Sequence, residues 1–244
     1  MKKLFEINPD LDRNALAAQF ARDTRVQVRN VLTEETAKEI RMILASQTPW
    51  GLAMQAGENA EAQQILAKEL QTPQGKQKAQ QLATQAYQET HKAGYGFHFA
   101  QYSLVQALQE KWNPDGPHEL LLEYLNAADF IQLARDVTGI PELVKADGQC
   151  TLFAPQHFLG KHIDSHVAEG WRVAYVLNLA MDDWHPDWGG YLNFLDEDGD
   201  IVAGYRPRFN ALNLFAVPQA HHVSFVPPFA PVGRFAITGW LRDR

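Results

Sequence analysis

The stretch GQCTLFAPQHFLGKHIDSHVAEGWRVAYVLNLA, residues 148–180, decides the fold class of this chain. It contains three short apolar runs separated by turn-forming residues, which is the pattern of successive β-strands. The pattern continues downstream, and the expected strands cover 149–154, 158–164, 171–180, 190–195, 201–205, 211–217, 221–226 and 234–241. Many short strands in so few residues are typical of a β-sandwich or a β-barrel.

Residues 1–147 have a different pattern, and we expect them to be mainly helical. Thr33 is placed to cap a helix whose first turn holds two glutamates, because carboxylates suit the positive end of a helix. The Ala-, Gln- and Lys-rich stretch 57–92 predicts two helices broken near Pro73, and the alternating aromatic run 95–102 predicts a strand. The sequence therefore predicts an α+β protein, one structural unit in which helices of region 1–147 pack on one sheet of a jelly-roll-like core, 148–244.

Composition narrows the functional classes. The formal net charge is -7, which argues against a nucleic-acid-binding protein that relies on overall charge. The single cysteine, Cys150, cannot form a disulfide within the chain, and this favours a reducing compartment. No apolar stretch approaches the roughly 18 residues of a membrane-spanning helix, and residues 1–6 lack the apolar run of a signal peptide. We therefore expect a soluble cytoplasmic protein with no nucleic-acid or membrane partner, while the oligomeric state stays open.

Two histidines and one aspartate are the candidate catalytic and metal-binding residues. His162 and Asp164 are two positions apart in an expected strand, so their side chains point to the same face. Alone, this pattern fits equally well a surface histidine beside a turn aspartate. His221 opens a later expected strand and shares the face of Val223, whereas His222 does not. Two imidazoles and one carboxylate leave coordination positions open, as in non-haem Fe(II) oxygenases; a structural zinc site usually includes cysteines.

Arg234 opens the last apolar run, Arg-Phe-Ala-Ile-Thr-Gly-Trp, and is therefore expected in or near the interior of a sheet. A buried guanidinium requires an anionic partner, and its planar shape matches a carboxylate through two parallel hydrogen bonds. The sequence leaves two partners open: an Asp or Glu of the chain itself, or the carboxylate of a ligand.

Residues 148–243 resemble the prolyl 4-hydroxylase branch of the 2-oxoglutarate- and Fe(II)-dependent oxygenases. A fainter similarity, to the prolyl hydroxylases that modify a ribosomal protein, extends upstream to 95–102 and 137–140. The resemblance rests on five segments in the family's order: FLGKHID at 158–164, WGGYL at 188–192, FNALNLF at 209–215, HHV at 221–223 and RFAITGW at 234–240.

The resemblance implies a double-stranded β-helix core and a hydroxylase that uses Fe(II) and 2-oxoglutarate, with ascorbate as a further cofactor to consider. In this family pattern His162, Asp164 and His221 would bind the iron and carry catalysis. Arg234 would bind the distal carboxylate of 2-oxoglutarate.

Two positions depart from the family pattern. Asn178 stands where the family often has a tyrosine that helps to bind 2-oxoglutarate, and Phe153 stands where another tyrosine is common. Because an amide still donates hydrogen bonds to a carboxylate, we expect Asn178 to contact the co-substrate. Phe153 has no group that could do so.

The resemblance implies that the substrate is a prolyl residue of a protein or peptide. Two alternatives stay open, because substrate loops vary freely on a shared fold. One is a hydroxylase of the same chemistry acting on a free amino acid or another small metabolite. The other is a metal- or ligand-binding protein without catalysis, which the departures at Asn178 and Phe153 keep open.

Overall fold

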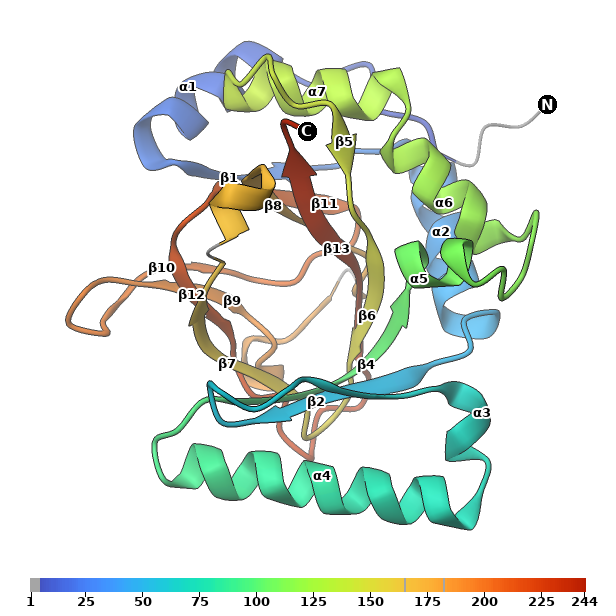
Figure 1. Ribbon diagram of the computed structural model, residues 1–244. Coiled ribbons are helices and arrows are strands. Elements are labelled where there is room, and N and C mark those ends of the chain that lie inside the picture. Colours follow the sequence, from blue (N-terminus) through green and yellow to red (C-terminus); the bar gives the residue numbers. More distant parts are fainter. Residues whose placement is uncertain (1–4, 165, 182) are drawn as a thin grey trace.

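The computed structural model describes residues 5–164, 166–181 and 183–244. An antiparallel β-sheet curls into a nearly closed barrel at its centre, and helices cover the barrel from outside (Figure 1). This is the α+β arrangement with a double-stranded β-helix core that the sequence predicts.

The strands of the second half lie close to their expected positions. The sheet runs through both halves of the chain, and its main path has the order β1-β11-β8-β13-β6-β4-β7-β12-β9-β10. The strands are β1 (Arg25–Arg29), β2 (Gly51–Ala56), β3 (Gln63–Ile65), β4 (Gly96–Ser103), β5 (Lys145–Ala146), β6 (Gln149–Phe153), β7 (Phe158–Ile163), β8 (Trp171–Asn178), β9 (Leu192–Leu195), β10 (Ile201–Tyr205), β11 (Ala211–Ala216), β12 (Ala220–Val223) and β13 (Arg234–Arg242).

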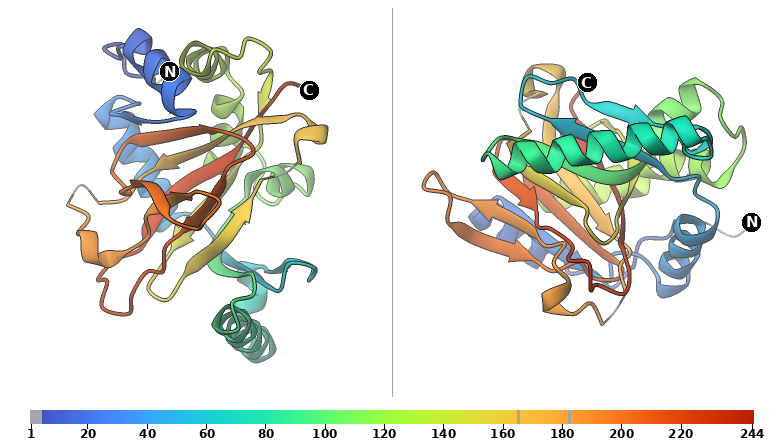
Figure 2. Two further views of the ribbon diagram at one scale, coloured as in Figure 1. Left: turned by 90° about the vertical axis from the view of Figure 1, so that its left-hand side faces the viewer. Right: turned by 90° about the horizontal axis from the view of Figure 1, so that it is seen from below.

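The helices come mainly from the first half. Most of them cover the outer face of the sheet, while α4 packs against β2 at the bottom of the barrel in the view of Figure 1 (Figures 1 and 2). The helices are α1 (Arg13–Asp23), α2 (Glu34–Ser46), α3 (Ala67–Leu70), α4 (Pro73–His91), α5 (Leu104–Gln109), α6 (Pro117–Leu125) and α7 (Ala128–Thr138), with 3-10 turns η1 (His166–Glu169) and η2 (Pro186–Trp188).

Strand alternation separates two environments on β8. Tyr175 and Leu177 face outward into the large core that the helices share with the sheet. Ala174 and Val176 face the inside of the barrel. Because successive residues of a strand point to opposite faces, one strand both anchors the helical layer and lines the interior.

Residues 1–147 also supply strands to the barrel. β1 pairs with β11, with Val28 opposite Leu212, and β4 pairs with both β6 and β7. Residues 63–65 form β3 instead of part of a helix, and Pro73 begins α4, where Thr72 accepts a hydrogen bond from the Gly75 backbone at 3.0 Å. The division of the chain at residue 147 therefore stays a prediction, because the sheet extends across it.

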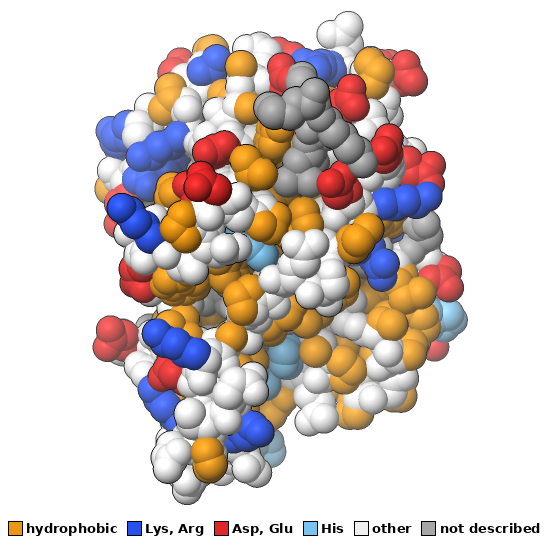
Figure 3. Space-filling model, turned by 90° about the vertical axis from the view of Figure 1, so that its right-hand side faces the viewer, with side chains coloured by type: hydrophobic (Ala, Val, Ile, Leu, Met, Phe, Trp, Pro, Cys, Tyr) orange, Lys and Arg blue, Asp and Glu red, His pale blue; other side chains and the backbone are white. Residues whose placement is uncertain are grey.

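The described surface carries charged side chains of both signs. On the face shown in Figure 3, Lys and Arg side chains are interspersed with Asp and Glu, so this face has no extended area of one sign of charge. None of the described helices combines the length and apolarity that crossing a bilayer requires.

Candidate metal centre and its cavity

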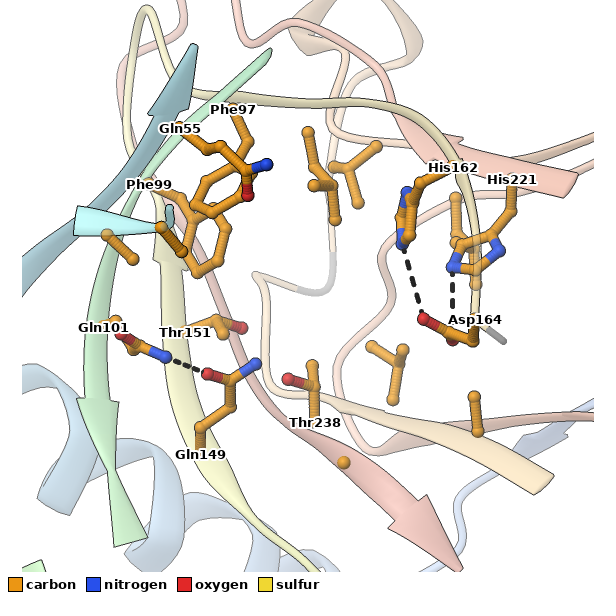
Figure 4. Close-up of a pocket in the computed structure, with 18 of the residues that line it drawn as sticks. Gln55, Phe97, Phe99, Gln101, Gln149, Thr151, His162, Asp164, His221 and Thr238 are labelled. Atoms are coloured by element: carbon orange, nitrogen blue, oxygen red, sulfur yellow. Dashed lines mark hydrogen bonds and ion pairs between the residues drawn. The ribbon is translucent and has the colours of Figure 1, made fainter. Parts of the chain in front are cut away.

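His162, Asp164 and His221 meet on the inside of the barrel. β12 runs antiparallel to β7, with His221 directly opposite His162, and Asp164 follows β7 immediately. The Nε2 atoms of His162 and His221 each lie 3.7 Å from a different carboxylate oxygen of Asp164 (Figure 4). One potential ligand atom from each of the three residues lies within 4.8 Å of the other two. The two strands therefore bring together the three residues singled out in the sequence.

Backbone carbonyls fix the orientation of both imidazoles. Nδ1 of His162 lies 2.9 Å from the Gly160 oxygen, and Nδ1 of His221 lies 2.8 Å from the Gln219 oxygen. A carbonyl oxygen only accepts a hydrogen bond, so each Nδ1 carries the proton and donates. Each Nε2 then presents its lone pair to the centre of the group, which is how carbonyl partners prepare histidines for a metal ion.

The surroundings favour the neutral form of His221. Its side chain is buried, and burial lowers the pKa of His221 to about 4, with the neighbouring His162 as the second cause. A neutral imidazole is the form that binds a metal. His222 lies apart: its Nε2 is 3.1 Å from Nδ2 of Asn193, and it does not belong to the group of three.

Arg234 is buried at the start of β13. Only 2% of it is exposed. Its Nε donates to Oδ1 of Asn178 and its Nη1 to the Gly190 oxygen, each at 3.1 Å, while its guanidinium lies over the Phe153 ring, 5.4 Å from the centroid. Burial alone lowers the pKa of Arg234 to about 10. Within the described parts of the chain no carboxylate forms an ion pair with Arg234, so the internal salt bridge considered above is not observed.

The Gly189-Gly190 turn brings a carbonyl to Arg234. Both glycines have positive φ, 63° and 68°, a conformation that favours glycine. A Cβ on Gly189 would lie 2.0 Å from the Phe225 oxygen, so no other residue fits without a backbone shift. The WGGYL segment thus has a local physical role, which is to let the Gly190 carbonyl approach the guanidinium.

Asn178 lies beside Arg234 and does not line the cavity. The residue is fully buried, and its Nδ2 is 3.3 Å from both the Val176 and Ala211 oxygens. Its Oδ1 accepts from Arg234. With its amide group engaged in this way, Asn178 orients the arginine, and the expected direct contact between Asn178 and the co-substrate is not favoured by this geometry.

One cavity of about 940 Å³ joins these groups. Its lining includes the two histidines and the aspartate as well as Arg234. Figure 4 shows the rest of the wall opposite the histidines, where aromatic and neutral polar side chains from β2, β4, β6 and β13 point inward. The cavity can therefore hold a metal ion and an anionic ligand side by side.

Residues 148–242 match the family model described as the 2OG-Fe(II) oxygenase superfamily. This is the region whose strands β6–β13 build the candidate metal centre. A comparison with curated protein sequences finds no match.

Solved structures share the fold at low sequence identity. A prolyl-4-hydroxylase from Pseudomonas putida aligns with a TM-score of 0.58 and 18% identity, covering 95% of this chain and 99% of that one. A 2OG-Fe(II) oxygenase family oxidoreductase from Burkholderia pseudomallei aligns with a TM-score of 0.59 and 14% identity, covering 98% and 94%. A prolyl hydroxylase from Trichoplax adhaerens, solved with a peptide of the hypoxia inducible factor oxygen degradation domain, aligns with a TM-score of 0.59 and 15% identity, covering 95% and 89%.

Proposed function

We propose that residues 148–242, which match the family model of the 2OG-Fe(II) oxygenase superfamily, form the catalytic core of an oxygenase of this kind. In this proposal His162, Asp164 and His221 bind Fe(II), Arg234 binds 2-oxoglutarate, and the enzyme hydroxylates a prolyl residue of a protein or peptide. One observation carries the assignment of the site. Two imidazole lone pairs and a buried carboxylate face one point, in the same cavity as a buried arginine that has no carboxylate partner among the described residues.

The donor set fits Fe(II) better than a structural zinc ion. Two neutral nitrogens and one carboxylate occupy one side of an ion and leave positions for a ligand and dioxygen. A structural zinc site fills its fourth position, usually with cysteine. Cys150 faces the outer core instead, and no fourth metal-binding side chain joins the three among the residues described.

The residues around the site have separate tasks in this proposal. When bound, Fe(II) would supply the oxidative chemistry of the family, in which 2-oxoglutarate, dioxygen and a C–H bond give succinate, carbon dioxide and a C–OH group. The Gly160 and Gln219 carbonyls keep both histidines in the metal-binding tautomer. Arg234 neutralises and orients the distal carboxylate of the co-substrate, and positioning of this kind lowers the barrier without any new bond to the protein.

The prolyl substrate is supported by the fold neighbours. Two of the three structures compared above are named prolyl hydroxylases, and one of them was solved with a bound peptide. The identities of 15–18% establish the fold only, so the substrate of this chain is a proposal that needs its own test.

The proposal is tested by supplying the protein with Fe(II), 2-oxoglutarate and dioxygen together with a pool of capped peptides that each contain one proline. We expect succinate to form and a peptide to gain the mass of one oxygen atom. Asp164→Ala is the control and should give neither product. Succinate and hydroxylated product with free L-proline but not with any peptide would favour the small-molecule alternative, and no succinate under any condition would favour a binding protein.

A further inference from the structure

Along strands β6 and β13 the side chains on the inner face of the barrel change from charged and aromatic to neutral polar. Arg234 lies opposite Phe153 at one end of the pairing. Four residues further along β13, Thr238 lies opposite Gln149. At about 3.4 Å per residue this places Thr238 roughly 14 Å from Arg234 along the strand. The cavity thus has a cationic end that suits an anionic co-substrate and, beyond it, a wall of neutral polar groups.

Two glutamines on this wall form a pair. Gln101, on β4, and Gln149 both line the cavity and point toward each other (Figure 4). Nε2 of Gln101 donates a hydrogen bond to Oε1 of Gln149. In the register of β4 against β6, Gln101 lies opposite Thr151, and Gln149 is two residues before Thr151 on the same strand. The pair is therefore held by two neighbouring strands of the same sheet.

The pair leaves a complementary donor and acceptor unused. A primary amide has one carbonyl oxygen and two N–H groups. After the mutual hydrogen bond, the carbonyl of Gln101 and the NH₂ of Gln149 have no partner within the described part of the chain. If the oxygen and nitrogen positions were exchanged in both amides, Gln149 would donate and Gln101 would accept. One carbonyl oxygen and one NH₂ group would still be left without a partner.

A peptide group is the ligand that matches this arrangement. It carries one N–H and one C=O and no charge, so it can satisfy both free groups at once. A free amino acid carries an ammonium and a carboxylate, and these would need charged partners when desolvated. Beyond the candidate metal group and Arg234, the charged residues in the described lining are Glu58 and Lys161, and both are exposed.

We propose that the Gln101–Gln149 pair is the subsite that binds a main-chain peptide group of the substrate, adjacent to the residue that is hydroxylated. This inference rests on the proposed function and makes it more specific. The substrate is then recognised through its backbone as part of a chain, and not as a free amino acid.

The test uses the capped proline peptide that is hydroxylated best in the pool described above, together with free L-proline as the second probe. Gln101→Met and Gln149→Met retain side-chain length but remove the amide. Each should raise KM for the peptide by about three- to tenfold, the effect of one lost hydrogen bond, with a smaller change in kcat. The matched control is Gln77→Met, an exposed position on α4, which should leave KM unchanged.

A second measurement needs no variant. In a series of peptides, each main-chain amide near the proline that carries an N–H, which leaves out the X–Pro bond itself, is replaced in turn by an ester, which cannot donate a hydrogen bond. Binding to the wild-type protein, loaded with Fe(II) and 2-oxoglutarate without oxygen, should weaken by about three- to tenfold at one position of the series. The Gln101→Met/Gln149→Met double variant should bind that ester and the parent peptide equally well.

The outcomes separate the inference from the function on which it rests. If peptides are hydroxylated but neither the glutamine variants nor any ester changes KM or affinity, the subsite is wrong and the prolyl hydroxylase proposal stands. If free L-proline is hydroxylated in preference to every peptide, the backbone subsite is also wrong. If neither probe is hydroxylated, the prolyl proposal fails, and the subsite that depends on it fails too.

Discussion

Asn178 and Arg234 form a hydrogen bond inside the barrel, in which Nε of the arginine donates to Oδ1 of the asparagine at 3.1 Å and both residues are almost completely buried. The bond uses one edge of the guanidinium, and the Gly190 carbonyl holds Nη1. These two contacts hold Nε and Nη1 in place, and no hydrogen bond of Nη2 is found among the described residues. We therefore expect Asn178, which stands where the family often has a tyrosine, to act through the arginine.

Replacing Asn178 should therefore weaken 2-oxoglutarate binding indirectly. Asn178→Ala removes a hydrogen bond to a charged group, an interaction worth roughly 1.5–3 kcal/mol, and we expect the dissociation constant for 2-oxoglutarate to rise by about tenfold or more. Fe(II) affinity should not change. Asn213→Ala is the matched control, because Asn213 is also buried in the sheet but bonds to Gln27. An unchanged 2-oxoglutarate affinity in Asn178→Ala would show that Arg234 is positioned without it.

The assignment of His221 over His222 gives a second prediction. His221→Ala should abolish Fe(II) binding and turnover, as should His162→Ala and Asp164→Ala, because each leaves only two protein ligands. His222→Ala should bind Fe(II) as the wild type does, because its imidazole contacts Asn193. Anaerobic Fe(II) titration of the four variants measures this. The reverse result for the two adjacent histidines would place the wrong histidine in the site.

Stability should depend on pH through a histidine outside the cavity. His118, on α6, is 3% exposed, its Nε2 lies 2.8 Å from the Thr48 hydroxyl, and burial lowers the pKa of His118 to about 4. The unfolded chain, with a histidine pKa near 6.5, binds more protons between these two values. The stability is therefore fully present above about pH 6.5 and is lost as the pH falls toward 4.

His118→Phe keeps a ring but cannot titrate. Between about pH 7.5 and pH 5 the free energy of unfolding should fall in both proteins, but less in His118→Phe than in the wild type. The difference between the two falls should be on the order of 1–2 kcal/mol. Urea denaturation at both values measures the difference. The comparison isolates His118, because the two proteins differ at this position alone. Parallel pH profiles would contradict the assignment.

Cys150 should be unreactive in the folded protein. It is fully buried on the outer face of β6, and burial raises the pKa of its thiol. A thiol-specific reagent such as DTNB should react with it only after a denaturant is added, because the thiolate is the reactive form. Rapid reaction without denaturant would mean that the packing between β6 and the helical layer opens readily. The same assay checks the folding of every variant proposed above.

The sequence predicts the part of the fold and of the site that depends on local pattern. The strands of the second half follow from alternation and turns. The choice of His221 over His222 follows from the His-x-Val pattern of the family that the sequence resembles, and strand parity with Val223 supports it. The strands that residues 1–147 add to the barrel are harder to predict. The segment 51–56 has the sequence Gly-Leu-Ala-Met-Gln-Ala without clear alternation, and its pairing with β4 supplies the ladder that makes it a strand.

Contacts between distant strands are beyond what the sequence alone indicates. The hydrogen bond between Asn178 and Arg234, 56 positions apart, depends on the pairing of β8 with β13, which the sequence does not indicate. Gln101 and Gln149 lie 48 positions apart in regions of different character. Their pairing follows from the register of β4 against β6, which no local pattern encodes. The sequence places each glutamine in an expected strand but does not indicate that the two side chains meet.

The most direct test of the central claim is an anaerobic titration of 2-oxoglutarate into the Fe(II)-loaded protein, followed by the metal-to-ligand absorption band. The wild type should develop a saturable band, and His221→Ala should develop none. Arg234→Lys keeps the charge but loses the bidentate geometry, so its affinity should fall by about tenfold to a hundredfold, and Arg234→Ala should bind more weakly still while retaining Fe(II). A wild type without the band, or an Arg234→Ala variant with unchanged 2-oxoglutarate affinity, would contradict the account.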